Sequence, residues 1–232
     1  MQKHAFLIIA HNNWGQLKKL IECLDSQTHD IFVHVDKKSK EFDESYFLDS
    51  VTKSSLRFYR EFTVYWGGFS QVQVEMFLLE QAYIEGYDYY HIISGVDLPL
   101  KNNKEIDLFF EENKGKEFIL YDNNILEDNP EISRRTKYYH YTNCADELFI
   151  QTIAYNCGFK DCIYSVGNEA ANLRYIDWSR GKNGNPYTFR KQDEELLMSN
   201  ENLFARKFSE IIDPGIIQHI YTKIEQENKS NV

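Results

Sequence analysis

Short apolar runs alternate with segments of helical spacing through the first half of the chain, and this alternation limits the folds that the chain can adopt. The runs typical of buried strands are AFLIIA, IFVHVD, LRFYR, YYHIIS and EFILYD, at 5–10, 31–36, 56–60, 89–94 and 117–122. Apolar residues recur at helical spacing around 17–24, 69–83 and 103–113. Strands that alternate with helices indicate βαβ units. The sequence therefore predicts an α/β fold with a mostly parallel sheet.

Polar residues stand where three of the predicted strands end. His11 follows the first strand, Asp36 closes the second, and the stretch SGVD at 94–97 closes the fourth. Right-handed crossovers place the carboxyl ends of parallel strands at one edge of the sheet. Ligands bind at this edge in open α/β folds. We therefore expect a ligand site there.

The second half of the chain is less regular. We expect a helix over 146–155, a strand over 172–178, a loop over 181–186 and a closing helix that begins around Pro214, with four isoleucines on one face. Neither a repeat nor a convincing linker divides the chain. The sequence therefore predicts a single domain over 1–232.

Charge and cysteine usage exclude some function classes. The formal net charge of the 232 residues is -10, which argues against nucleic acid as a partner. The apolar run after Met1 is too short for a signal peptide or a membrane span. The four cysteines have no Cys-x-x-Cys spacing. We expect reduced thiols in a cytoplasmic protein, and peripheral contact with a membrane surface stays open.

The stretch LFARKF at 203–208 holds two adjacent cations, Arg206 and Lys207, between apolar residues. The chain contains no Asp-x-Asp. An enzyme that uses a nucleotide sugar without acidic metal ligands must neutralise the leaving diphosphate in another way, and an Arg–Lys pair can do so. The alternative is a solvated surface pair whose stems cover apolar surface.

Three acidic or histidine patterns allow more than one interpretation. Asp36 could contact the base or ribose of a nucleotide, or pair with Lys37 or Lys38. The doublet Asp146-Glu147 could complement a helix dipole or supply a general base, and a hydrolase with two catalytic carboxylates is conceivable. The histidines at 11, 34 and 91 lack the tight spacing of zinc ligands.

Seven stretches in order resemble the core-2/I-branching β-1,6-N-acetylglucosaminyltransferase family, glycosyltransferase family 14, which includes the peptide xylosyltransferases. They are AFLIIAHNN, IFVHVDKKS, VYWGGFSQV, YYHIISGVDLPLK, ADELFIQT, LRYIDW and LFARKF, and they cover nearly the whole chain. The resemblance implies a GT-A-type, Rossmann-like nucleotide-sugar-binding fold. It also implies inverting transfer from a UDP-sugar to a glycan hydroxyl, with neither a divalent metal nor another cofactor.

The resemblance further implies a role for particular residues. Glu147 matches the catalytic base, and Arg206 with Lys207 matches the pair that binds the diphosphate. The remaining matches lie near the uridine and the donor sugar: His11, Asp36, Trp66, Gly67, Gly68, Ser94, Gly95, Val96 and Asp97.

One departure from the family concerns the acceptor side. Relatives carry a long segment before the acidic doublet, whereas here Tyr141 runs almost directly into Cys144. Either the chain is short by nature or a segment is missing near 141–145. We expect GlcNAc as the donor sugar, with xylose as the alternative, and a role in surface polysaccharide assembly. A non-catalytic module that binds nucleotide sugars or glycans is the competing function.

Overall fold

The computed structural model describes residues 2–120, 144, 146, 149–165 and 171–230. Its central sheet has the strand order β3-β2-β1-β4, and all of its neighbouring strands run parallel. These strands are β1 (His4–Ala10), β2 (His29–Val35), β3 (Leu56–Tyr59) and β4 (Tyr89–Ser94). The chain thus adopts the predicted α/β architecture, with a mostly parallel central sheet of the GT-A, Rossmann-like type.

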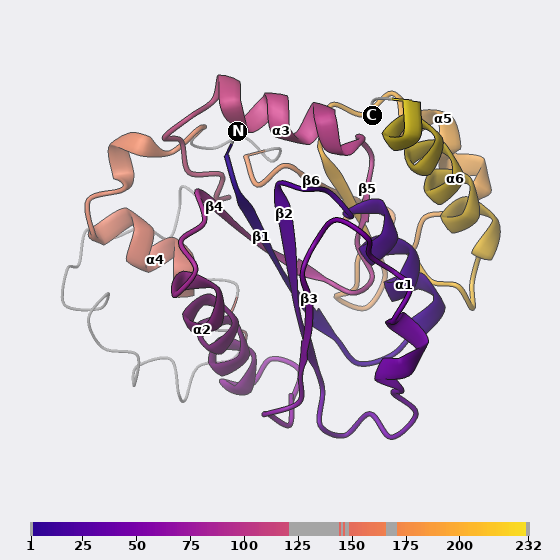
Figure 1. Cartoon of the computed structure of the whole chain (residues 1–232), viewed down its shortest axis with the longest axis horizontal. Coiled ribbons are helices and arrows are strands. Elements are labelled where there is room, and N and C mark those ends of the chain that lie inside the picture. Colours follow the sequence, from indigo (N-terminus) through magenta and orange to yellow (C-terminus); the bar gives the residue numbers. More distant parts are fainter. Residues whose placement is uncertain (1, 121–143, 145, 147–148, 166–170, 231–232) are drawn as a thin grey trace.

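Helices cover both faces of this sheet (Figure 1). The α-helices are α1 (Trp14–Cys23), α2 (Ser70–Tyr83), α3 (Asn103–Glu112), α4 (Phe149–Asn156), α5 (Glu194–Met198) and α6 (Pro214–Ser230). Short 3-10 helices are η1 (Glu44–Phe47), η5 (Lys160–Cys162) and η6 (Lys191–Asp193). Among the described helices, none combines the length and the apolar character needed to cross a bilayer.

Strand β1 is apolar from Ala5 to Ala10 because both of its faces are buried. Phe6 and Ile8 pack into the cluster that contains α1 and α6, whereas Ala5 and Leu7 pack into the cluster that contains α2. Side chains alternate between the faces of a strand, so a strand covered on both sides reads as a continuous apolar run. This is why AFLIIA identifies a strand from sequence.

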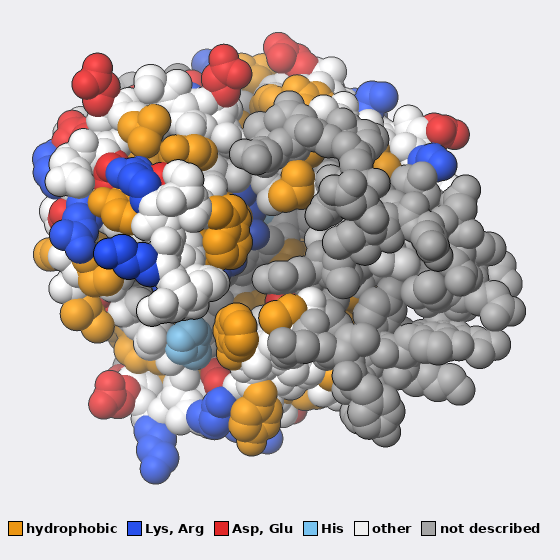
Figure 2. All heavy atoms as spheres, turned by 180° about the vertical axis from the view of Figure 1, so that it is seen from behind, with side chains coloured by type: hydrophobic (Ala, Val, Ile, Leu, Met, Phe, Trp, Pro, Cys, Tyr) orange, Lys and Arg blue, Asp and Glu red, His pale blue; other side chains and the backbone are white. Residues whose placement is uncertain are grey.

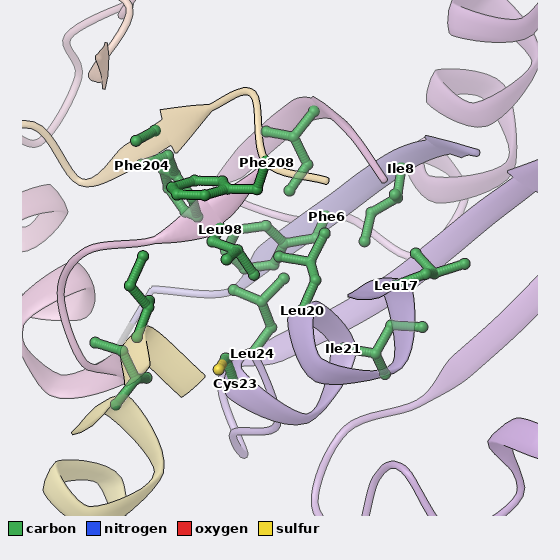
Figure 3. Close-up of a cluster of buried hydrophobic side chains, with 14 of the residues drawn as sticks. Phe6, Ile8, Leu17, Leu20, Ile21, Cys23, Leu24, Leu98, Phe204 and Phe208 are labelled. Atoms are coloured by element: carbon green, nitrogen blue, oxygen red, sulfur yellow. The ribbon is translucent and has the colours of Figure 1, made fainter. Parts of the chain in front are cut away.

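A second, three-stranded sheet extends the core. Strand β7 (Phe204–Arg206) lies between β5 (Leu98–Pro99), which is antiparallel to it, and β6 (Arg174–Ile176), which is parallel to it. Figure 3 shows Leu98, Phe204 and Phe208 packed with Phe6 and the leucines of α1. One buried cluster therefore joins the two sheets and fixes how β7 sits beside β1 and β4.

Helix α3 begins with two interlocking hydrogen bonds. The Asn102 side chain accepts from the Glu105 backbone N–H at 3.1 Å, and the Glu105 carboxylate accepts from the Asn102 N–H at 3.0 Å. Such a capping box satisfies N–H groups that a helix start leaves unpaired. The Asn103 N–H also donates to Asn228 Oδ1 on α6 at 2.8 Å. These bonds fix α3 near the amino ends of β1 and β2, where its Asp107 contacts His29.

Three predicted elements differ from the structure in their extent. In the segment predicted as a strand at 117–122, Glu117 forms an isolated bridge with Ile163, 118–120 form no strand, and 121–122 lie outside the described residues. The strand pairing does not extend beyond Glu117 because its partner, Ile163, directly follows the 3-10 helix η5, which ends at Cys162. The next residue, Phe118, packs among aromatic rings. The predicted strand at 172–178 is only three residues long, Arg174–Ile176. The described part of the predicted helix at 146–155 begins at Phe149.

Candidate functional site

The carboxyl edge of the central sheet brings several predicted site residues together. The Asp36 N–H donates to the Ala10 carbonyl at 2.9 Å, and the Gly95 N–H donates to the Ile9 carbonyl at 2.9 Å. The Phe208 N–H in turn donates to the Val96 carbonyl at 3.1 Å. This chain of backbone bonds places His11, Asp36, the turn at 94–97 and the end of β7 side by side. The expected convergence of these segments is therefore present.

Asp36 is a buried carboxylate that organises the loops around it. Its Oδ1 accepts from the Lys38 N–H at 3.0 Å and from the Val64 N–H at 3.2 Å, and its Oδ2 lies 3.5 Å from Lys38 Nζ. Pairing with Lys38, the structural alternative, is thus present. Contact of Asp36 with a nucleotide stays a prediction.

Asp97 holds the turn after β4 from within. It is fully buried; Oδ2 accepts from the Ser94 N–H at 2.6 Å, and Arg174 binds both carboxylate oxygens at 2.8 Å. Such a two-pronged Arg–carboxylate contact fixes geometry as well as charge. Asp97 therefore positions the turn, and any effect it has on a ligand passes through the backbone of that turn.

Gly95 permits a close approach between this turn and β1. A Cβ atom at Gly95 would lie 3.0 Å from the Ala10 side chain and 3.6 Å from Leu17. Because Ala10 and Leu17 are buried, neither can move aside easily. A larger residue would separate the turn from the strand end, so glycine at this position keeps the edge of the site compact.

Arg206 and Lys207 follow the register of β7 to the same edge. Pairing of Leu98 with Ala205 sets the residues before β5 against those that end β7. Lys207 Nζ lies 3.5 Å from Asn185 Oδ1, which belongs to the predicted loop at 181–186. The apolar neighbours of the pair are buried, as the sequence suggested: Leu203, Phe204 and Phe208 are each at most 3% exposed. The two cations thus stand on a rigid backbone.

Lys and Arg side chains are unevenly distributed over the surface. Seen from behind, several gather on the side of the molecule that carries α5 and α6 (Figure 2). An acidic protein can bind an anion where cations are focused locally. The distribution is compatible with such a site despite the formal net charge of -10.

The loop that contains Trp66 and Gly67 contacts the segment before α4. Gly67 has a φ of 67°, a left-handed conformation that glycine adopts without strain, and the Gly68 N–H closes the turn on the Tyr65 carbonyl at 3.0 Å. The Gly67 carbonyl accepts from the Cys144 N–H at 2.8 Å. Trp66 is 81% exposed. This loop therefore presents a large exposed aromatic side chain next to the backbone contact with Cys144.

The acidic doublet is described only at its first residue. Asp146 Oδ2 accepts from Gln71 Nε2 at 2.9 Å, so Asp146 is tied to the first turn of α2. Glu147, the predicted catalytic base, lies outside the described residues, as does most of the short segment at 141–145. The role of Glu147 stays a prediction.

One half-buried and one buried residue of this region, Arg174 and Glu75, were not assigned a role from sequence. Arg174 pairs with Asp97, and Glu75 on α2 is 8% exposed. Burial, reinforced by the nearby Asp146 carboxylate, raises the pKa of Glu75 to about 8. A charged residue within the apolar spacing of a helix, as in SQVQVEMFLLE, was the available signal for Glu75. Arg174 had no comparable signal, because its partner lies far away in sequence.

The histidines considered for a metal site serve other purposes. His34 is buried, its Nε2 accepts from the Phe62 N–H at 3.1 Å, and burial lowers its pKa to about 4. His91 lies 2.9 Å from His4 at the other end of the sheet, and His11 is exposed. The described residues therefore do not bring His11, His34 and His91 together as ligands.

Comparison with known proteins agrees with this architecture. The profile of the Core-2/I-Branching enzyme family matches residues 4–129, which is more than half of the chain. The chain is 25% identical over 126 residues to xylosyltransferase 2 of Mus musculus, a match that covers 50% of this chain and 14% of that relative. The chain thus spans only a small part of that protein. Because the family profile covers β1 to β4 together with the strand ends that form the site, this chain belongs to the Core-2/I-Branching enzyme family.

Proposed function

We propose that this chain is an inverting glycosyltransferase that transfers a sugar from a UDP-sugar to a hydroxyl group of a glycan. The observation that carries the proposal is the position of Arg206 and Lys207, beside the turn at 94–97 on the carboxyl edge of a parallel sheet. Ligands of open α/β folds bind at this edge. Two adjacent cations on a buried, apolar support suit the diphosphate of a nucleotide sugar.

The proposed reaction is a single in-line displacement. An acceptor oxygen attacks the anomeric carbon as Glu147 removes its proton, the bond from that carbon to the diphosphate oxygen breaks, and UDP leaves from the opposite face. General base catalysis contributes about 10²–10⁴-fold. Arg206 and Lys207 stabilise the negative charge that develops on the leaving diphosphate. Their rigid backbone limits the reorganisation needed during the reaction.

A divalent metal is not part of this mechanism. The sequence contains no Asp-x-Asp to hold one at the diphosphate, and the cationic pair offers a substitute. We expect transfer activity to survive treatment with EDTA at a temperature where the protein stays folded. Loss of activity that Mn²⁺ or Mg²⁺ restores would contradict metal-free transfer.

The donor sugar is the finer part of the proposal. GlcNAc is the first candidate, because the family profile is that of the Core-2/I-Branching enzymes. Xylose is the alternative, since the similar mouse protein is named a xylosyltransferase. We propose a surface polysaccharide as the acceptor. Turnover of UDP-GlcNAc and UDP-xylose, measured side by side, distinguishes the two donors.

A module that binds nucleotide sugars without catalysis is the second candidate function. The short segment between Tyr141 and Cys144 favours it, because relatives carry their acceptor-side residues there. Such a module would bind UDP but release none from a UDP-sugar. Both functions therefore predict UDP binding, but only the transferase predicts release of UDP from a UDP-sugar.

The test measures UDP release from a panel of UDP-sugars, with and without glycan acceptors, for the wild type and for Glu147→Gln. We expect turnover by the wild type, slow hydrolysis included, and a loss of about 10²–10⁴-fold in the variant, with UDP binding retained. UDP binding without any turnover would support the binding module. Normal turnover by Glu147→Gln would move the role of base elsewhere, with Asp146 as the first candidate.

A further inference from the structure

A second cluster of polar side chains lies at the amino edge of the central sheet, away from the site described above. His4 and His29 begin β1 and β2 and are direct neighbours in the parallel register, and Asp107 reaches them from α3. His4 and His11 are seven positions apart along β1, a distance of about 23 Å at the rise of an extended chain. Nothing in the proposed transfer reaction uses this cluster.

The potential ligand atoms of the cluster are close together. Asp107 Oδ1 lies 2.9 Å from His29 Nε2 and 3.7 Å from His4 Nε2, and the three atoms all lie within 4.8 Å of one another. Nitrogen ligands about 2.0 Å from a tetrahedral zinc ion lie about 3.3 Å apart. The two distances to Asp107 lie on either side of this value, so each histidine needs only a small shift relative to Asp107 to share an ion with it.

The hydrogen bonds of His29 leave two acceptor atoms, His29 Nε2 and an Asp107 carboxylate oxygen, facing each other. His29 Nδ1 lies 3.1 Å from the Leu24 carbonyl, which can only accept, so the ring N–H belongs there. A neutral His29 then turns the lone pair of Nε2 toward an Asp107 carboxylate oxygen, 2.9 Å away. Two acceptors at this distance need either a proton or a cation between them.

His4 favours the cation over the proton. Its Nε2 is buried and has no hydrogen-bond partner among the residues that the structure describes. A proton on His29 would satisfy His29 and Asp107 but would leave His4 Nε2 unpaired, at a cost comparable to that of other buried unpaired polar atoms. A metal ion satisfies all three atoms at once.

The surroundings of the cluster match those of metal sites. Metal-ligating histidines commonly bond through their second ring nitrogen, and ligating carboxylates are themselves hydrogen-bonded. Here His4 Nδ1 lies 2.9 Å from His91 Nε2, His29 Nδ1 faces the Leu24 carbonyl, and Asp107 Oδ2 accepts from Thr28 Oγ1 at 2.9 Å. The rings are therefore already oriented with their remaining nitrogens toward Asp107.

An ion could reach the cluster from solvent. His4 and His29 are at most 1% exposed, but the Asp107 side chain is 21% exposed. Asp107 lines a cavity of about 510 Å³ together with residues that include Gln2, Asp25 and Asn103. This cavity has room for water, which can complete a four-coordinate site.

We propose that His4, His29 and Asp107 bind a Zn²⁺ ion at the amino edge of the sheet, with water from the adjoining cavity as the fourth ligand. Two imidazole nitrogens and one carboxylate oxygen are a donor set that suits zinc better than magnesium or calcium. The ion would join β1, β2 and α3, so its effect would be on folding and stability.

The first test uses the whole wild-type chain. The protein is stripped with a chelator, supplied with Zn²⁺ and passed through a desalting column, and the retained zinc is measured by mass spectrometry. We expect one zinc per chain, a higher melting temperature, and an X-ray absorption spectrum with only nitrogen and oxygen ligands at about 2.0–2.1 Å. No retained zinc, or a spectrum dominated by sulfur from the free cysteines, would overturn the proposal.

The second test compares two substitutions. Asp107→Asn keeps the size of the side chain but removes its charge, and we expect zinc affinity to fall by at least about 100-fold. Loss of a residue that only hydrogen-bonds to a metal ligand already lowers metal affinity by about 10–100-fold, and Asp107 would be a ligand itself. The control is His219→Gln on α6, which alters an exposed pair in which His219 Nε2 lies 2.9 Å from Glu194 Oε1. We expect the control to bind zinc normally.

Transfer activity separates this proposal from the proposed function. Asp107→Asn should retain UDP-sugar turnover at a temperature where circular dichroism shows it to be folded, because Asp107 lies at the far edge of the sheet. If Asp107→Asn bound zinc as tightly as the wild type, the cluster would be a protonated histidine paired with a carboxylate, and the zinc proposal would be wrong.

Discussion

The two ends of the central sheet carry polar residues on the same strands but use them differently. At the carboxyl edge, Asp36 and Asp97 accept backbone N–H groups and shape turns, while Lys207 and Trp66 stand closer to solvent. At the amino edge, His4 and His29 are buried, and both lie close to the Asp107 carboxylate. A polar residue at a strand end is therefore not a site by itself. Its burial and its partners decide whether it can meet a ligand or only hold the fold.

The largest effect that we expect concerns the ion pair at the carboxyl edge, in which Asp97 is buried and Arg174 is half-buried. Asp97→Ala leaves Arg174 without its partner and the Ser94 N–H without its acceptor, so the free energy of unfolding should fall by about 3–5 kcal/mol. Glu85→Ala removes the exposed partner of Arg57 and should lower the free energy of unfolding by at most about 1 kcal/mol. Urea denaturation measures both. Equal losses would show that Asp97 does not organise the turn.

The next effect tests whether the cations at the carboxyl edge act in transfer. Arg206→Ala and Lys207→Ala should each lower kcat/KM by about 100-fold, because removing one donor to a developing negative charge typically has a consequence of this size. Lys207→Arg should also be poorly tolerated, since a planar fork does not replace a point charge. Lys229→Ala, at the exposed end of α6, is the control. A solvated surface pair would behave like Lys229.

Glu75 gives a pH-dependent effect of intermediate size. Its folded-state pKa of about 8 exceeds the ordinary value of 4.5, so the folded protein keeps a proton that the unfolded chain releases between these values. Stability is therefore lost as the pH rises from about 4.5 to about 8. Glu75→Gln should remove this loss and be more stable than the wild type at pH 8, by about 1–3 kcal/mol.

The measurement for Glu75 is the free energy of unfolding of both proteins at pH 4.5 and at pH 8. The stabilisation should appear mainly at the higher pH. If Glu75→Gln destabilised the protein equally at the two values, the Glu75 carboxyl would not hold a proton in the folded state.

The smallest effect compares two glycines with left-handed backbones. Gly67 has a φ of 67° in the loop at the carboxyl edge, and Gly115 has a φ of 79° after α3. Alanine at either position should cost about 1–2 kcal/mol in stability. Only Gly67→Ala should also lower the rate of transfer, since only this turn carries Trp66 and accepts a hydrogen bond from Cys144, two residues before Asp146. Equal rates for the two variants would separate the loop at 65–68 from the site.

The sequence predicted the first half of the fold because burial on both faces leaves a continuous apolar run. Strands β1 and β2 contain such runs, β4 contains a shorter one, and helices α1 to α3 were predicted from apolar residues at helical spacing. Strands β5, β6 and β7 have two or three residues each, too few for any periodicity. Their formation depends on the core between the two sheets, so only β6 falls within a predicted strand, at 172–178, and neither β5, β7 nor the pairing of the three strands was predicted.

The strand ends of the site were predictable for a related reason. Once strands are parallel, topology alone places His11, Asp36 and the turn at 94–97 at one edge. Contacts between distant residues had no such guide. Asp97 and Arg174 are 77 residues apart in sequence, and His29 and Asp107 are 78 apart. Only the packed structure brings such pairs together, so both the ion pair and the histidine cluster escaped prediction.

The most direct test of the central claim, that the carboxyl edge binds the diphosphate of a UDP-sugar, is a calorimetric titration. UDP and uridine are titrated separately into the wild type, Arg206→Ala and Lys207→Ala. We predict that the wild type binds UDP, that both variants bind it at least about 10-fold more weakly, and that uridine, which lacks the phosphates, binds all three proteins alike. Unchanged UDP affinity in both variants would contradict the assignment of this edge as the nucleotide-sugar site.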